Sequence, residues 1–96
     1  MLREMNTVTF VQETIDLNGD RITFRIFRQG DTVFASASKM KAGGLGWEEM
    51  VALGSVSTVT SEKPTISVDK VGHRVLLRIG KLSAVFDGNA QSMRIQ

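Results

Sequence analysis

The segment of residues 21–28, which follows an Asn-Gly pair at residues 18–19, constrains the fold more than any other part of the chain. In a β-strand, successive side chains point to opposite faces of the sheet. Alternation along this segment therefore places Ile22, Phe24 and Ile26 together on one apolar face. The opposite face receives cationic, polar and aromatic side chains, namely Arg21, Thr23, Arg25 and Phe27. We predict a strand with one face against a core and the other face directed outward.

Turn signals separate a series of alternating segments along the chain. Asn18-Gly19 is the strongest of them, because both central residues of a type I′ turn need positive φ. It predicts a hairpin between residues 7–17 and 20–29, with a β-bulge near residues 10–12 where the apolar residues change parity. Further turns are predicted at residues 29–31, 71–72, 80–81 and 87–89, and the other expected strands are residues 32–38, 55–60, 65–69, 73–80, 82–86 and 92–96.

One helix is predicted within this β pattern, from Trp47 to about Leu53. Trp47, Met50 and Val51 follow the i, i+3, i+4 spacing of an apolar helical stripe. The predicted fold class is mainly β (α+β): an antiparallel curved sheet, a small barrel or a sandwich of six to eight short strands, with one short helix inserted midway. We expect residues 1–96 to form a single globular domain, because single domains commonly have about this length.

The composition excludes several classes of protein. The chain contains no cysteine, which rules out disulfide frameworks, zinc-thiolate sites and thiol nucleophiles. No window approaches the roughly 20 apolar residues of a membrane span, and residues 1–5 are not followed by the apolar region of a signal peptide. We therefore expect a soluble, cytoplasmic protein without a membrane partner.

No residue pattern indicates catalysis, a metal site or a cofactor. His73 is the sole histidine, and a general base also needs a positioned partner and a substrate pocket. Residues 16–27 begin like a calcium loop, but Arg21 stands where an EF-hand needs glycine and Phe27 stands where it needs glutamate. No serine lies in a Gly-x-Ser-x-Gly frame. We predict a non-enzymatic protein that holds no metal and no cofactor.

The charge distribution leans mildly toward an anionic partner, while charge alone is more typical of a solvated sheet face with no partner. From Ser61 onward there are six cations against three anions, whereas the net charge of the whole chain is only +2. Single-stranded nucleic acid is bound where cations contact phosphates and aromatic rings or guanidinium planes stack on bases. If the outward rows of the strands share one sheet face, the candidate nucleic-acid-binding residues are Arg21, Arg25, Phe27, Arg74, Arg78 and Lys81.

A protein partner is the alternative, and the two interpretations stay open at this point. Phe27, Leu76 and Val85 are outward apolar residues that could form an interface with another protein or with a second copy of this chain. An exposed edge strand such as residues 55–60 could serve the same purpose. In a sandwich with both faces covered, these residues would instead belong to a second core. Salt dependence separates the first two interpretations, because phosphate contacts release counterions and apolar contacts do not.

Overall fold

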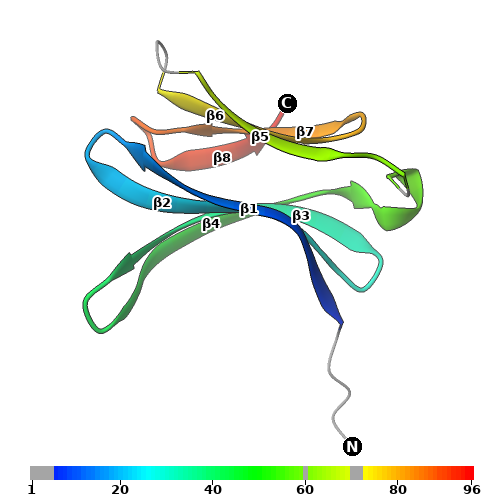
Figure 1. Cartoon of the computed structure of the whole chain (residues 1–96), viewed down its shortest axis with the longest axis horizontal. Coiled ribbons are helices and arrows are strands. Elements are labelled where there is room, and N and C mark those ends of the chain that lie inside the picture. The colour runs from blue at the N-terminus through cyan, green and yellow to red at the C-terminus, as the bar shows by residue number, and fades with distance from the viewer. Residues whose placement is uncertain (1–5, 60, 70–72) are drawn as a thin grey trace, which may run out of the picture.

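The computed structural model describes residues 6–59, 61–69 and 73–96, which form two four-stranded antiparallel sheets (Figure 1). Each sheet is a meander in which every strand pairs with its neighbour in the chain. Sheet A contains β1 (Thr7–Leu17), β2 (Asp20–Gln29), β3 (Thr32–Lys41) and β4 (Gly44–Ser55). Sheet B contains β5 (Pro64–Asp69), β6 (Arg74–Ile79), β7 (Leu82–Asp87) and β8 (Ser92–Ile95). The predicted mainly β, antiparallel class is confirmed, in the form of a sandwich.

The hairpin of β1 and β2 has the turn that its sequence predicts. Asn18 and Gly19 have φ values of 54° and 83°, as a type I′ turn requires. The register of the two strands shifts between Thr9 and Val11, which confirms the predicted β-bulge near residues 10–12. After the bulge in the chain, Val11 lies opposite Ile26, so the apolar residues of both strands share one face.

The helix predicted at residues 47–53 is wrong, because this segment forms most of β4. Trp47 and Val51 lie opposite Lys39 and Ala35 of β3, on the side that faces the core. Met50 falls on the other side of the strand, so the three residues share no stripe. Pairing with β3 overrides the local helical spacing, since strand preference depends on tertiary context.

The edge strand expected at residues 55–60 is also wrong. A single 3-10 turn occupies residues 56–58 and connects the two sheets. The Ser55 hydroxyl begins this turn by accepting a hydrogen bond from the Ser57 amide at 3.3 Å. The turns predicted at residues 29–31, 80–81 and 87–89 are confirmed, whereas the one predicted at residues 71–72 lies outside the described residues.

The core fills the space between the two sheets. Phe24 of β2 meets Phe86 of β7 edge to face with ring centroids 5.4 Å apart, and Trp47 stacks on Phe86 at 5.9 Å. Ala35 and Ala37 point inward, which settles the orientation of β3 that alternation alone leaves open. The buried core residues are Leu17, Ile22, Phe24, Ile26, Val33, Ala35, Ala37, Leu53, Val59, Val75, Leu77, Ile79, Ala84, Phe86 and Met93.

In the described parts of the chain, no helix has the length and apolar character needed to cross a membrane. The sheets are stacked so that β1 lies over β5, β2 over β6 and β4 over β8. Each sheet therefore has one inner face, which belongs to the common core, and one outer face. Any surface that recognises a ligand lies on these outer faces, on the edges or at the turns.

Candidate functional site

The described residues offer no enclosed site for chemistry. They contain no pocket and no group of three or more His, Asp or Glu side chains that could hold a metal ion. His73 is half-buried in a turn, with φ of 54°, and its carbonyl oxygen accepts a hydrogen bond from the Gly88 amide at 2.8 Å. The backbone of His73 thus helps to join β6 to the turn after β7, and the candidate site is sought on the outer faces.

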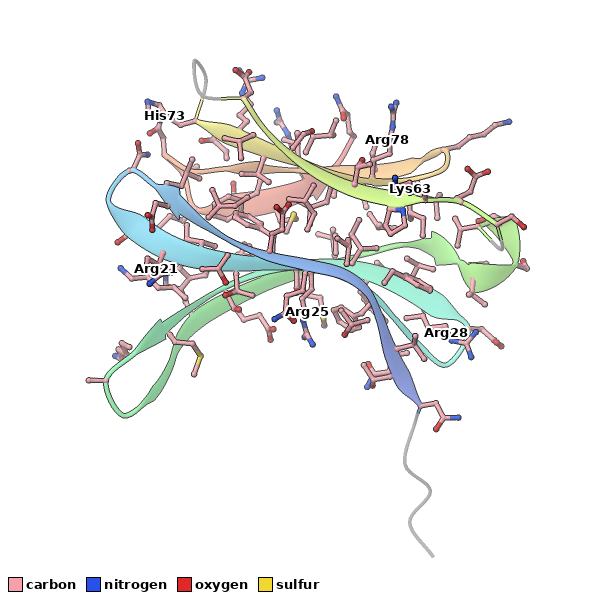
Figure 2. The ribbon with its side chains drawn as sticks, viewed as in Figure 1. Arg21, Arg25, Arg28, Lys63, His73 and Arg78 are labelled. Carbon is pink, nitrogen blue, oxygen red and sulfur yellow. The ribbon has the colours of Figure 1, made fainter. Side chains whose placement is uncertain are left out.

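The four arginines predicted to share one face are separated by the core, and that hypothesis is wrong. Arg21 and Arg25 alternate with the inward residues of β2, so they project from the outer face of sheet A. Arg74 and Arg78 alternate with the inward residues of β6 and project from the outer face of sheet B. Figure 2 shows Arg25 and Arg78 pointing away from each other on opposite sides of the sandwich.

An aromatic pair packs on the outer face of sheet A, which no second layer of the described residues covers. Phe27 stacks on Phe34 with centroids 5.5 Å apart, and the Arg25 guanidinium lies 4.4 Å from the centre of the Phe27 ring. As a result, Phe27 is only 4% exposed. The Phe27 ring is therefore covered by its neighbours.

Apolar groups that sequence reasoning did not nominate are the accessible ones on this face. Phe34 lies opposite Phe27 on one side and Ala52 on the other, while Met50 lies opposite the buried Ser36. Met50 is 48% exposed and Phe34 is half-buried. Phe27, Phe34, Met50 and Ala52 are called the sheet A patch below. The signal for Met50 was alternation along residues 47–53, which the helical interpretation obscured.

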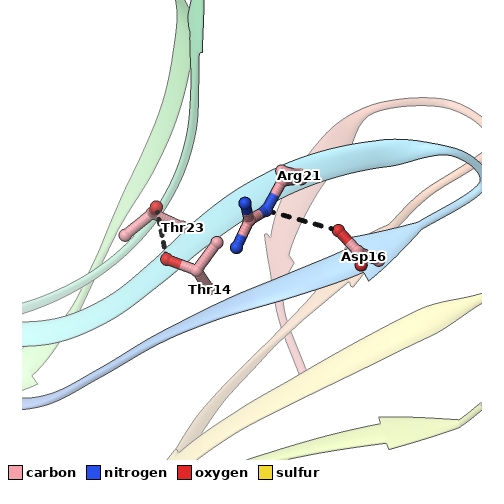
Figure 3. Close-up of polar contacts among 4 residues, drawn as sticks. All are labelled: Thr14, Asp16, Arg21 and Thr23. Atoms are coloured by element: carbon pink, nitrogen blue, oxygen red, sulfur yellow. Dashed lines mark hydrogen bonds and ion pairs between the residues drawn. The ribbon is translucent and has the colours of Figure 1, made fainter.

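The outer face of sheet A ends in a polar region whose groups satisfy one another (Figure 3). The Arg21 Nε atom lies 3.5 Å from the Asp16 carboxylate, and both side chains are largely exposed. The Thr14 and Thr23 hydroxyls are 3.0 Å apart and form a hydrogen bond across the two strands. Asp16 partly neutralises Arg21, so this cation is a weaker ligand for a phosphate than its position alone suggests.

The outer face of sheet B has apolar residues at its centre and charges around them. Leu76 and Val85 are cross-strand partners, and both are half-buried. Arg74 lies between Asp69 and Asp87 on the neighbouring strands, whereas Arg78 is flanked by uncharged residues. Lys81 is exposed in the turn between β6 and β7.

One carboxyl group on sheet B has a displaced pKa. The backbone amides of Asn89 and Ala90 donate hydrogen bonds to Asp87 Oδ1 at 2.9 and 3.3 Å. These bonds stabilise the charged carboxylate and lower the pKa of Asp87 below its ordinary 3.8, with Arg74 and Arg94 acting in the same direction. The carboxylate terminates β7 and shapes the turn, and Arg74 lies across from it on β6.

The edges of both sheets carry features that oppose strand addition. Glu13 of β1 lies opposite Phe24, and Glu49 of β4 lies opposite Ala37, so each edge strand of sheet A places a charge at an inward position. Register shifts interrupt both strands. In sheet B, β5 begins at Pro64 and β8 has only four residues. Inward charges, bulges, proline and short strands are the means by which natural sheets block edge pairing.

On the outer face of sheet A, the ring that Arg25 contacts is the buried Phe27, and the described outer face of sheet B has cations without an aromatic ring. The aromatic pair belongs to sheet A, and Arg74, Arg78 and Lys81 belong to sheet B. Comparisons with protein-family models, with curated proteins and with solved structures find no match for this chain. The two outer faces are therefore interpreted from their own side chains.

Proposed function

We propose that this protein is a non-catalytic module that binds another protein chain through the outer face of sheet A. The observation that carries the proposal is the sheet A patch, where Met50 is 48% exposed beside half-buried Phe34 on a face without a second layer. Aromatic and methionine side chains are enriched where proteins meet, and the flexible thioether of methionine adapts to different partner surfaces.

A protein fits this face better than single-stranded nucleic acid. Stacking on bases needs exposed ring faces, but one side of the Phe27 ring contacts Phe34 and the Arg25 guanidinium lies over the ring. Arg21 is paired with Asp16. Glu48 is exposed on the same face and would repel phosphates. Mixed charges around an apolar centre are typical of protein interfaces.

The face also supports the proposal better than the edges do. Strand addition requires a row of free backbone groups on a flat edge strand. If a partner strand paired with β1 or β4, the inward charges of Glu13 and Glu49 would be buried in the new interface or in the core. The partner is therefore expected to contact side chains of the sheet A patch.

Site-specific photocrosslinking tests the proposal. A photoreactive amino acid replaces Met50 in one variant and the exposed turn residue Ala90 in the control. We expect the Met50 probe to give a discrete protein adduct that excess unlabelled wild type abolishes and excess unlabelled Met50→Asp does not. Sedimentation analysis then shows whether the partner is a second copy. Equal adducts from both probes, or an adduct to nucleic acid alone, would overturn the proposal.

A further inference from the structure

The two sheets differ in charge. Residues 61–96 carry six cations and three anions, a net charge of +3, and the whole chain carries +2, which leaves −1 for residues 1–60. Sheet B and its turns therefore form the basic part of the molecule. Charge of one sign gathered on one side attracts partners of the opposite sign and accelerates their association.

The excess positive charge lies at one end of sheet B. Lys63 directly precedes β5, Arg78 lies near the end of β6, and Lys81 lies in the turn that follows β6. Pairing of Pro64 with Ile79 brings the start of β5 beside the end of β6, so the three cations lie at the same end of the sheet. These three cations are called the basic end below. Within the described parts of the chain, no carboxylate lies within ion-pair distance of any of them. Figure 2 shows Lys63 and Arg78 at the same end of the sheet.

The opposite end of the same face has one described arginine between two carboxylates. Asp69 and Asp87 lie across from Arg74 on the two adjacent strands. Between the two ends, Leu76 and Val85 form a half-buried apolar pair, and Arg94 lies across from Val85 on β8. Glu62 packs beside Gly80 at the basic end, so the three cations there outnumber one carboxylate. The face therefore presents an apolar centre with an excess of cations toward one end and Arg94 along one side.

We propose that the outer face of sheet B is a second binding surface, which takes an acidic, extended segment of a partner protein. Carboxylates of the segment would pair with Arg78 and with Lys63 or Lys81, and an apolar side chain would cover Leu76 and Val85. Guanidinium groups bind carboxylates by paired, charge-assisted hydrogen bonds. The described outer face of sheet B carries no aromatic ring on which a base could stack, which favours a peptide over single-stranded nucleic acid.

Fluorescence anisotropy with a defined peptide tests this second surface. The probe is a labelled eight-residue peptide that alternates Glu and Val, with a Gln-Val peptide and an oligothymidine of eight nucleotides as comparisons. We expect the wild type to bind the Glu-Val peptide at low salt, and more weakly as salt rises. Arg78→Gln should weaken binding about threefold to tenfold, the range for losing a charge-assisted contact at a protein surface. Leu76→Ala should weaken it while leaving the salt dependence unchanged.

Arg25→Gln is the matched control, because it removes the same charge from the opposite side of the sandwich. We expect it to leave peptide affinity unchanged. Equal losses of peptide affinity from Arg25→Gln and Arg78→Gln would show that binding depends only on the overall charge, and would overturn the proposal. Tighter binding of the oligonucleotide than of the peptide, or no binding of the peptide at low salt, would also overturn it. Met50→Asp should leave peptide binding intact, so failure of either surface is distinguishable from failure of the other.

Discussion

Truncation of Phe27 tests whether the outer face of sheet A holds an aromatic cluster of its own. The side chain is 4% exposed, so Phe27→Ala removes a nearly full burial, which contributes about 1.5–3 kcal/mol. Stacking on Phe34 at 5.5 Å adds about 0.5–1.5 kcal/mol. The Arg25 guanidinium at 4.4 Å adds about 0.5–1 kcal/mol. Together these contributions amount to about 2.5–5.5 kcal/mol. Because the space left by the ring opens to solvent, we expect Phe27→Ala to lower the free energy of unfolding by about 3 kcal/mol, in the lower half of this range.

Urea unfolding followed by tryptophan fluorescence measures this loss. Trp47 is the sole tryptophan and stacks on Phe86, so its emission reports exposure of the core. Phe34→Ala is the matched control, and its half-buried ring predicts a smaller loss of about 1–2 kcal/mol. A Phe27→Ala variant within about 1 kcal/mol of the wild type would refute the reasoning. The Phe27 ring would then be free for a partner, as the sequence alone suggested.

Two further predictions concern the Asp87 turn and the sheet edge. The pKa of Asp87 is lower in the folded than in the unfolded chain, so its contribution to stability is present above the ordinary value of 3.8 and is lost as pH falls through the folded value. Asp87→Asn should therefore be less stable than the wild type at neutral pH, with the difference shrinking below about pH 4 in acid titrations followed by circular dichroism. Glu49→Val should promote concentration-dependent association in sedimentation velocity, because an inward charge no longer blocks the β4 edge. Glu49→Gln should stay monomeric if the wild type does, and association by both variants would remove the edge argument.

The sequence predicts the local part of this fold well. Hairpins, the bulge and the inward rows of β2 and β6 follow from turn chemistry and alternation, both of which act between residues close in the chain. The helix prediction fails where two periodicities compete. Trp47, Val51 and Leu53 fit alternation, whereas Trp47, Met50 and Val51 fit a helical stripe. Pairing with β3 decides between them, and that pairing is a tertiary contact that a short window does not contain.

The candidate site was harder to predict, because alternation gives the face of a strand and not the face of the molecule. Arg25 and Arg78 are both outward in their own strands, yet they belong to different sheets. Exposure also depends on which side chains pack against a residue, as Phe34 and Arg25 do against Phe27. Phe27 is outward and still buried, while Met50 on the same face is 48% exposed. Alternation along a single strand predicts neither the sheet to which a residue belongs nor its exposure.

Separation of the two proposed surfaces by the core has a thermodynamic consequence. The two sheets of a sandwich lie about 10 Å apart, and the side chains on their outer faces project further away from each other. Sites separated by more than about 10 Å without shared contacts usually contribute additively. Partners on the two faces should therefore bind without excluding each other, and a Met50→Asp, Arg78→Gln double variant should show each single effect unchanged. Coupling between the two changes would require the sheets to shift against each other, which the interlocked Phe24, Phe86 and Trp47 rings oppose.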